Sequence, residues 1–405
     1  MNILFFLPSY GKGGAATTQL WSELSEHLAT RHDVVVIAAY SSPIEVSMAG
    51  RTVNGVRLIK IGDGVLSKIR NRHFREILMW LFMLLKSLSI QGRFDVVICV
   101  DNPRFSSFIA WIRKIYDRSS IVMWAMDLTL EQVVRREKLK GISGHFKTFL
   151  NGLYFRSLAL CDKVVVLGSC MKDLMLASGV AGKRVQVVGP WLEACAGNQH
   201  IEASTARKSQ GLNEFFTVTY LGYAGAWHEF ETIVDAISEI NTKYPVQFLF
   251  VGQGPGIDSV AYAKKKFRWD RVILRQWVPR QDLRELPFCG DVHLVSLKQN
   301  MLGTCVPSKT YGAMAYCRPV IFLGPTECQA ACDIRAADAG IVVQTKDEFV
   351  AAIGKLYSDR KGLENFSRNA RNAFLEQHCS TVMFQQWDDL LVSFESDSLD
   401  RCKRV

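Results

Sequence analysis

A short segment around residue 308 carries residue types that suit the binding of a diphosphate. Pro307, Ser308 and Lys309 stand between a predicted strand over 291–295 and a predicted helix that ends at Arg318 and Pro319. A first helical turn leaves backbone N–H groups unpaired and the helix dipole favours negative charge, so an anion would be stabilised there. Lys309 would add a cation and Ser308 a hydroxyl. The alternative is an ordinary strand-turn-helix connection with Pro307 in the first turn.

Glycine-rich loops follow two other predicted strands. Gly13 and Gly14 come after the first strand of the chain, and Gly222 and Gly225 follow a strand that ends near residue 221. Because small residues let a ligand approach the backbone closely, both loops are candidates for donor binding. The first loop has neither the Gly-Lys-Ser/Thr ending of a P-loop nor the spacing of the dinucleotide fingerprint, so a plain tight turn is its alternative.

Two more features of the second half point to the same kind of ligand. His228 follows the second glycine loop and could contact a sugar phosphate, although a helix cap or a surface position is the commoner role of such a histidine. Gly252 and Gly254 end the next strand. A glycine loop in that position is expected where the carboxyl edge of a sheet lines a nucleotide pocket.

Acidic residues mark a second candidate site in the first half of the chain. Asp127 and Glu131 follow a predicted strand over 121–124, so both carboxylates should lie at the carboxyl edge of a sheet. They could bind acceptor hydroxyl groups or act as a base, but capping of the next helix explains Asp127 equally well. The chain contains no Asp-x-Asp pair and no Cys/His cluster with metal spacing, so we expect neither a bound metal nor a cofactor.

Size and composition limit the class of protein. The 405 residues exceed one compact core, and 48% hydrophobic content is enough for two. The net charge of +10 indicates an anionic partner, which could be nucleic acid, acidic lipid or a phosphorylated metabolite. Eleven scattered cysteines suggest reduced thiols of a cytosolic protein. The first seven residues look like a strand rather than a signal peptide, and no apolar run is long enough to span a membrane.

Strands and helices alternate along the chain in the pattern of parallel α/β sheets. One series of predicted strands runs to residue 188 and a second from 216 to 343. A polar stretch from Gly189 to about Leu212 separates them and is predicted to be a linker. We therefore expect two doubly wound domains facing a cleft, 1–189 and 190–380. An amphipathic segment over 381–394 is expected to cross back, so that about 381–405 would join the first domain.

A basic and apolar stretch over 68–86 could contact a membrane. Lys68, Arg70, Arg72, His73 and Arg75 precede a nearly continuous run of large apolar residues. This combination suits a helix that lies on an anionic membrane surface, and a second basic stretch over 135–140 favours this interpretation slightly. A core helix with a basic, solvated end is the alternative.

Together these motifs resemble the retaining glycosyltransferases of family four, which have the GT-B fold of two Rossmann-like domains. The resemblance covers nearly the whole chain, and its parts come in the family's order. They are the loop at 13–14, the acidic motif at 127–131, the strand at 161–167, the segment 188–191, the glycine loops at 222–225 and 251–254, the segment 278–280, and the helix region 307–321. The Pro-Ser-Lys form of that helix looks most like transferases for bacterial surface polysaccharides (O-antigen, capsule and colanic-acid type).

The chain departs from this family at several positions. The family usually has two glutamates seven residues apart near the helix, contacting the donor sugar and the ribose, and here Thr304 and Gly312 stand in their places. Ala226 replaces a basic residue of the second glycine loop, which leaves Lys309 as the expected phosphate cation. Residues 124–126 lack the histidine that many members place before the acidic motif.

The resemblance implies a function. We expect a retaining transferase that moves a hexosyl or N-acetylhexosaminyl group from a nucleotide diphosphate sugar, which is a substrate and not a cofactor, to a polyprenyl diphosphate-linked glycan. The first domain would bind the acceptor and the second the donor, with Lys309, Asp127 and Glu131 as catalytic candidates. The protein would lie on the inner face of the cell membrane and bind no nucleic acid. A sugar-nucleotide epimerase and a non-catalytic partner subunit are the alternatives.

Overall fold

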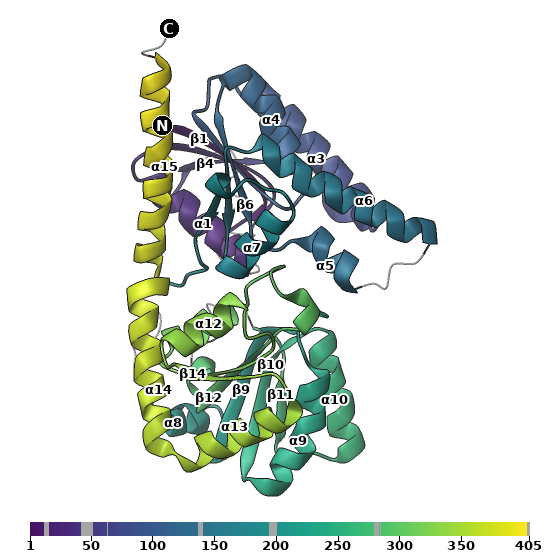
Figure 1. Ribbon diagram of the computed structural model, residues 1–405, viewed down its shortest axis with the longest axis vertical. Helices are drawn as coiled ribbons and strands as arrows, with labels where there is room; N and C mark the ends of the chain where they lie inside the picture. Colours follow the sequence, from purple (N-terminus) through teal and green to yellow (C-terminus); the bar gives the residue numbers. More distant parts are fainter. Residues whose placement is uncertain are drawn as a thin grey trace. The chain divides into compact units, whose positions relative to one another are not determined.

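The computed structural model describes residues 1–11, 16–41, 52–62, 64–136, 141–193, 201–278, 283 and 285–402. The chain forms two compact units, the first made of residues 1–189 and 384–405 and the second of residues 190–383. Each unit has its own parallel β-sheet with helices around it (Figure 1). The alternating pattern of the sequence therefore predicted the α/β class of both units correctly.

The sheet of the first unit has the strand order β3-β4-β2-β1-β5-β6-β7-β8 within the described residues. The bounds are β1 Asn2–Tyr10, β2 Asp33–Ser41, β3 Thr52–Val53, β4 Val56–Lys60, β5 Val96–Val100, β6 Ser120–Ala125, β7 Lys163–Val166 and β8 Val185–Val187. All the paired strands are parallel except β3, which pairs antiparallel with β4. The order reverses between β1 and β5, so a crevice is expected outside the carboxyl ends of these two strands.

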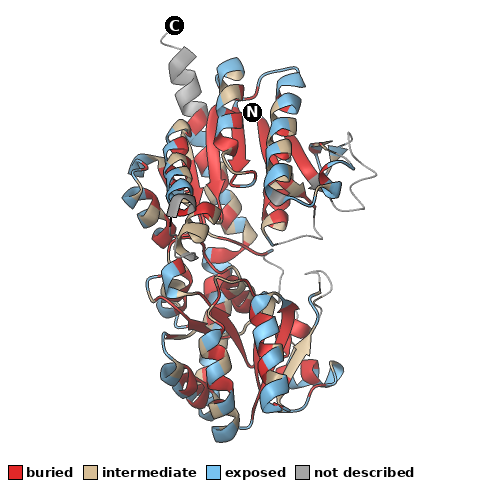
Figure 2. Cartoon of the chain, turned by 90° about the vertical axis from the view of Figure 1, so that its right-hand side faces the viewer, coloured by how far each residue is buried: buried red, intermediate tan, exposed pale blue. Residues whose placement is uncertain are grey.

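Helices cover this sheet, and the strands beneath them are almost entirely buried (Figure 2). Every residue of β5 and β6 is buried, as continuous apolar runs predict for central parallel strands. The helices are α1 Ala16–Leu28, α3 Arg72–Ser89, α4 Ser106–Asp117, α5 Thr129–Arg136, α6 Gly141–Ser157 and α7 Ser169–Ala177, with short 3₁₀ turns at Leu66–Lys68, Leu158–Leu160 and Gly182–Arg184.

The C-terminal helix α15, Ser380–Cys402, belongs to the first unit from Phe384 onward. Trp387 is fully buried and packs edge-on against Trp124 of β6, with 4.9 Å between ring centroids. The adjacent residue Asp388 pairs with His27 of α1 at 3.1 Å and with Arg31, which follows α1, at 2.9 Å. The apolar contact and the charged contact together hold this helix against the first unit.

The sheet of the second unit has the order β11-β10-β9-β12-β13-β14. Its strands are β9 Phe216–Tyr223, β10 Val246–Gln253, β11 Val272–Arg275, β12 Val292–Ser296, β13 Val320–Leu323 and β14 Gly340–Val343. The order reverses between β9 and β12, which is again where a ligand crevice is expected. The helices are α8 Ala203–Ser209, α9 Glu231–Lys243, α10 Pro255–Phe267, α11 Lys309–Ala315, α12 Gln329–Ala336, α13 Lys346–Ser358 and α14 Arg360–Ala373. Three shorter helical segments lie at Leu286–Phe288, Gln299–Met301 and Phe374–His378.

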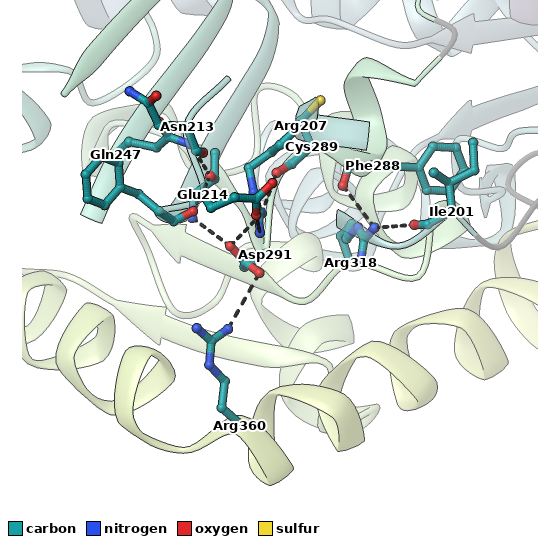
Figure 3. A network of polar contacts seen from close by, with 12 residues as sticks. Ile201, Arg207, Asn213, Glu214, Gln247, Phe288, Cys289, Asp291, Arg318 and Arg360 are labelled. Atoms are coloured by element: carbon teal, nitrogen blue, oxygen red, sulfur yellow. Dashed lines mark hydrogen bonds and ion pairs between the residues drawn. The ribbon is translucent and has the colours of Figure 1, made fainter. Parts of the chain in front are cut away.

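The predicted linker from Gly189 to about Leu212 contains the boundary between the two units, but its described residues after Gly189 pack within the second unit. Trp191 is buried, and Leu192 forms a bridge with Cys379 of the second unit. Helix α8 is anchored in the same unit because its Arg207 donates a hydrogen bond to Asp291 at 3.0 Å and another to the carbonyl of Cys289 at 3.1 Å (Figure 3). A polar, non-periodic stretch thus forms part of the second unit, held by a buried ion pair that hydrophobic periodicity cannot detect.

Candidate functional site

Glycine residues bring the ends of β9 and β10 into close contact in the second unit. Gly222 has a positive φ of 107°, and a Cβ placed on Gly252 would lie only 2.1 Å from the Gly222 carbonyl oxygen. Gly254 also has a positive φ, 112°, and a Cβ there would lie 2.7 Å from the carbonyl oxygen of Ala224. Only glycine fits these positions without moving backbone. The result is a closely packed glycine edge where the strand order of the sheet reverses.

Lys309 lies over this glycine edge. Its Cε would be 3.3 Å from a Cβ on Gly222, and its Nζ is 3.3 Å from Nε2 of His228. The ammonium group also lies 5.5 Å from the ring centroid of Tyr220 on β9. The structure therefore brings together Lys309, His228, Gly222, Gly252 and Gly254, which the sequence nominated separately.

His228 is buried, and not the surface or capping residue that a lone histidine usually is. Helix α9 begins at Glu231, with Phe230 as its N-cap. Burial, and then the charges of Lys309 and Lys298, lower the pKa of His228 well below its usual range, so the ring is neutral at pH 7. Because Nε2 accepts from the Lys309 ammonium, Nδ1 carries the hydrogen.

That Nδ1–H group is buried and has no hydrogen-bond partner among the described residues. Unsatisfied buried donors are rare in folded proteins and cost free energy unless a ligand or water pairs with them. A negatively charged phosphate oxygen or the oxygen of a sugar hydroxyl could accept this hydrogen bond. The lysine and the histidine together thus provide one cation and one neutral donor at the glycine edge.

Helix α11 begins two residues later than expected. Its first residue is Lys309 and its N-cap is Ser308, so Pro307 precedes the helix and does not occupy its first turn. The Ser308 side chain makes no capping hydrogen bond. The helix is only seven residues long, so its dipole contributes less here than the charge of Lys309.

The remaining donor-site residues of the second unit have other surroundings. Thr304 is fully buried and its hydroxyl donates to the carbonyl of Met301 at 2.8 Å, so it is committed to its own turn. Gly225 lies against the ring of Trp227, because a Cβ there would come within 2.6 Å of it. A Cβ on Gly312 would meet no neighbour within 4 Å, so packing does not require the missing side chain there.

In the first unit the two acidic candidates differ in their contacts. Asp127 follows β6 and is half-buried. Glu131 lies in the first turn of α5, where one oxygen accepts from Nε of Arg135 at 2.6 Å and the other from Nδ2 of Asn151 on α6 at 2.5 Å. Both carboxylate oxygens of Glu131 are therefore engaged within the protein. Gly13 and Gly14 lie outside the described residues.

A third carboxylate, which the sequence analysis did not nominate, lies at the same edge of the first sheet. Asp101 directly follows β5 and is 8% exposed, and its Oδ1 is buried without a hydrogen-bond partner. Burial raises the pKa of Asp101 to about 7, while the hydroxyl of Tyr154 and the amide and hydroxyl of Thr129 oppose the shift. The only sequence signal was an acidic residue immediately after an apolar strand, the same signal that singled out Asp127.

No cluster of three or more His, Cys, Asp or Glu side chains suited to a metal ion occurs in the described part of the chain. The Lys309 and His228 pair instead offers hydrogen-bond donors, which suit an anionic ligand.

Comparisons with known proteins agree with this picture of the second unit. Residues 216–359 match the family described as Glycosyl transferases group 1. A probable glycosyltransferase of Pseudomonas aeruginosa, WbjE, is 25% identical over 264 residues, which are 63% of this chain and 64% of that protein. The chain thus matches slightly less than two thirds of that relative's length.

Solved structures share the fold over nearly the whole chain. HepE of Anabaena, solved in complex with UDP and glucose, has a TM-score of 0.72 and 13% identity, covering 96% of this chain and 99% of its own. Sucrose-phosphate synthase of Thermosynechococcus elongatus has a TM-score of 0.76 and 15% identity, covering 98% and 99%. WaaG, a glycosyltransferase involved in lipopolysaccharide biosynthesis, has a TM-score of 0.67 and 16% identity, covering 96% and 99%.

The fold is that of the GT-B glycosyltransferases, with two Rossmann-like α/β units that each contain a largely parallel sheet. The fold expected from the sequence is thereby confirmed. The likeness in sequence to glycosyltransferases is shown for the second unit, where the family model matches, and for the part of the chain that aligns with WbjE.

Proposed function

We propose that this protein transfers a sugar, with retention at the anomeric carbon, from a nucleotide diphosphate sugar to a lipid-linked glycan during synthesis of a bacterial surface polysaccharide. The second unit would bind the donor and the first unit the acceptor. Support comes from the family match over 216–359 and from the relatives WbjE and WaaG, the latter named for lipopolysaccharide biosynthesis. The UDP and glucose bound by HepE support a nucleotide sugar as donor.

The observation that carries the donor side is the convergence of Lys309 and His228 on the glycine edge of Gly222. When the bond between sugar and diphosphate breaks, negative charge develops on the leaving phosphate. A fixed ammonium group and a buried Nδ1–H donor stabilise that charge more in the transition state than in the ground state, and this difference lowers the barrier.

The leaving phosphate can itself take the proton of the attacking acceptor hydroxyl, so this scheme needs no separate base in the second unit. Asp127 and Glu131 would then help to hold the acceptor in the first unit. For Glu131 the contacts favour a positioning role, because the hydrogen bond from Asn151 joins α5 to α6 and the Arg135 pair holds the carboxylate within α5.

A stripe of exposed apolar side chains on the first unit supports the proposal of a lipid-linked acceptor. On α3 the residues Phe74, Ile77, Leu81, Leu85 and Leu88 repeat at helical spacing, and each is 37–64% exposed. A stripe of this size is unusual on a protein surface that meets only water. It is accompanied by basic residues before and along the helix, and Lys68, Arg70 and Lys86 among them are exposed.

Other helices of the first unit also expose large apolar side chains. Helix α4, which packs beside α3, exposes Phe108, Trp111 and Ile115, and α6 exposes Phe146 and Phe149; the three helices are labelled in Figure 1. We define these side chains and the α3 stripe as the apolar face. Together with the basic residues near α3, it has the chemistry of a surface that lies on anionic lipid headgroups.

Within the described residues, no helix combines the length and the hydropathy needed to cross a bilayer. The proposal therefore concerns attachment to one membrane surface by the apolar face.

The proposal is tested in two stages. Thermal unfolding is first measured with a panel of nucleotides and nucleotide sugars, since a ligand at a hundred times its dissociation constant adds about 2.7 kcal/mol to the free energy of unfolding. The stabilising donor, radiolabelled, is then incubated with short-chain polyprenyl diphosphate sugars. Label in the lipid fraction supports the proposal. Formation of an epimer of the donor without acceptor indicates an epimerase, and donor binding with no product across the panel indicates a non-catalytic partner.

A further inference from the structure

We propose that Asp101 binds a hydroxyl group of the acceptor sugar in the first unit, as an acceptor-binding residue distinct from Asp127 and Glu131. This inference rests on the proposed transferase function. The inference extends that function by naming the side chain that holds the acceptor, the place of this side chain in the fold, and the ligand atom that it contacts.

The position of Asp101 follows from the strand order of the first sheet. The order reverses between β1 and β5, and Asp101 is the first residue after β5. In open α/β sheets, ligands bind outside the carboxyl ends of the strands at such a reversal, because the connecting helices leave on opposite faces and open a crevice there. Glu131, by comparison, lies one strand farther along, in the helix that follows β6.

The hydrogen bonding of Asp101 is incomplete. Its Oδ2 accepts from the amide of Thr129 at 3.5 Å and from the hydroxyl of Thr129 at 3.4 Å, both long contacts, and its Oδ1 has no partner. The hydroxyl of Tyr154 on α6 is buried beside the Asp101 carboxyl and interacts with it, which opposes the rise in the pKa of Asp101, but among the described residues neither this hydroxyl nor Oδ1 of Asp101 forms a hydrogen bond of good geometry. A carboxylate and a phenol left in this state destabilise the fold unless a ligand completes their hydrogen bonds.

A ligand hydroxyl fits this pair of groups. It can donate to Oδ1 of Asp101 and accept from the Tyr154 hydroxyl with the same oxygen atom. A metal ion fits less well, because no cluster of three metal-ligating side chains occurs among the described residues. The cation Arg104 is already paired with Glu76 at 3.1 Å, so its charge is shared. The burial that raises the pKa of Asp101 is consistent with a group kept for a ligand.

A purely structural role is the rival explanation. Asp101 accepts a hydrogen bond from the amide of Thr129, the first residue of α5. In this explanation its sole role is to cap that helix. Asparagine retains a carbonyl oxygen for this contact and nearly the same volume, whereas it loses the charge and half of the acceptor capacity. Asp101→Asn therefore separates the two roles.

The experiment measures initial rates with the donor at saturation and with the polyprenyl diphosphate sugar that the parent protein uses best. Asp101→Asn should lower kcat/KM for the acceptor by about 10- to 100-fold, mainly through KM, since a hydrogen bond to a charged group is lost. Binding of the nucleotide donor, measured by calorimetry, should stay unchanged. Tyr154→Phe should shift the acceptor KM in the same direction. Asp173→Asn, a matched change at an exposed position on α7, should behave as the parent.

Two outcomes overturn the inference. If Asp101→Asn folds, binds donor and keeps its acceptor kcat/KM within threefold of the parent, Asp101 is a helix cap only. If the parent protein transfers sugar to no acceptor in the panel, the proposed function fails first and this inference fails with it. A melting temperature of Asp101→Asn at pH 8 at or above that of the parent shows that a reduced rate does not come from unfolding.

Discussion

Lys309 contacts the end of β9 and the loop that contains His228. Both lie about 80 residues before it in the sequence. Its ammonium donates to a neutral histidine whose other nitrogen is buried without a partner. A buried donor without a partner destabilises the ligand-free protein. The same donor stabilises a bound anion. At the scale of single residues, this pair is the strongest argument for the donor site.

Lys309→Ala should therefore slow transfer strongly and leave the fold intact. By analogy with other fixed donors, the loss of one such contact raises the barrier by about 2.7 to 4 kcal/mol, which lowers kcat by two to three orders of magnitude. The measurement is kcat with saturating donor, accompanied by a thermal melt. Lys265→Ala, at an exposed position on α10, is the matched control and should retain full activity. Turnover of Lys309→Ala within threefold of the parent would refute the assignment.

Asp101 should also affect stability in a pH-dependent way. Burial raises the pKa of Asp101 in the folded protein to about 7, above the ordinary value of 3.8. Between these values the folded state holds a proton that the unfolded state has lost, so the contribution of this group to stability is present at low pH and declines as pH rises through 7. The shift corresponds to about 4 kcal/mol, as an order of magnitude.

Asp101→Asn should remove this decline. Relative to the parent, the variant should gain melting temperature between pH 5 and pH 8, even as it loses acceptor affinity. The measurement is the difference in melting temperature between the two proteins at each pH. A difference that stays constant over this range would show that the carboxyl group titrates normally.

The sequence identified some site residues and missed others for physical reasons. Lys309 and the glycines were recognisable because chain geometry restricts which residue types fit there. Asp101 was missed because a single aspartate after a strand is common, and only the strand order reveals that it lies at the reversal of the sheet. The hydrogen bond between Glu131 and Asn151 likewise depends on packing between α5 and α6, which one sequence does not reveal, whereas the pair with Arg135 has the i,i+4 spacing of one helix.

At the scale of elements, strands were predicted well and short polar elements were not. Central strands such as β5 and β6 are continuous apolar runs, and burial on both faces requires that composition. Helix α8 has seven residues and no apolar periodicity, and it is held mainly by the buried pair between Arg207 and Asp291. The two-residue strand β3 is too short to show alternation. The hydrophobic pattern of a sequence indicates which residues are buried. It does not indicate short elements such as α8 and β3, which depend on contacts with other parts of the chain.

The glycine edge of the second unit carries the hydrogen-bond donors Lys309 and His228, and no metal-binding cluster of His, Cys, Asp and Glu occurs among the described residues. Metal-dependent transferases that neutralise a diphosphate with Mg²⁺ need carboxylates to hold the ion, whereas here Lys309 and His228 provide the positive and polar groups. We therefore predict that transfer needs no divalent metal. Initial rates measured with excess EDTA should equal those without it. Complete loss of activity with EDTA and recovery with magnesium would contradict this prediction.

At the scale of the whole molecule, a net charge of +10 favours any anionic surface, but the basic residues near α3 also lie beside the apolar face. Attachment through the region of α3 and attachment through the net charge of the whole protein lead to different expectations. If attachment is local, charges near α3 should matter more than equal numbers of charges elsewhere. Each basic residue close to an anionic membrane contributes about 1 kcal/mol.

The last prediction tests this difference with sedimentation of anionic lipid vesicles. Replacing Lys68, Arg70, Arg72 and Arg75 by glutamine should weaken attachment by about three orders of magnitude, because roughly 4 kcal/mol is lost. The matched control replaces four exposed basic residues of the second unit, Lys265, Lys266, Arg268 and Lys355, and should weaken it much less.

Ile77→Gln with Leu85→Gln should reduce attachment even at low salt, where charge attraction is strongest, since it removes apolar contact and no charge. Nucleotide binding by the second unit should be unchanged in all these variants. Equal losses in the two four-residue variants would show that net charge alone causes binding. A parent protein that stays in the supernatant at low salt would instead show that the apolar face serves another contact, and the lipid-linked acceptor would lose its main structural support.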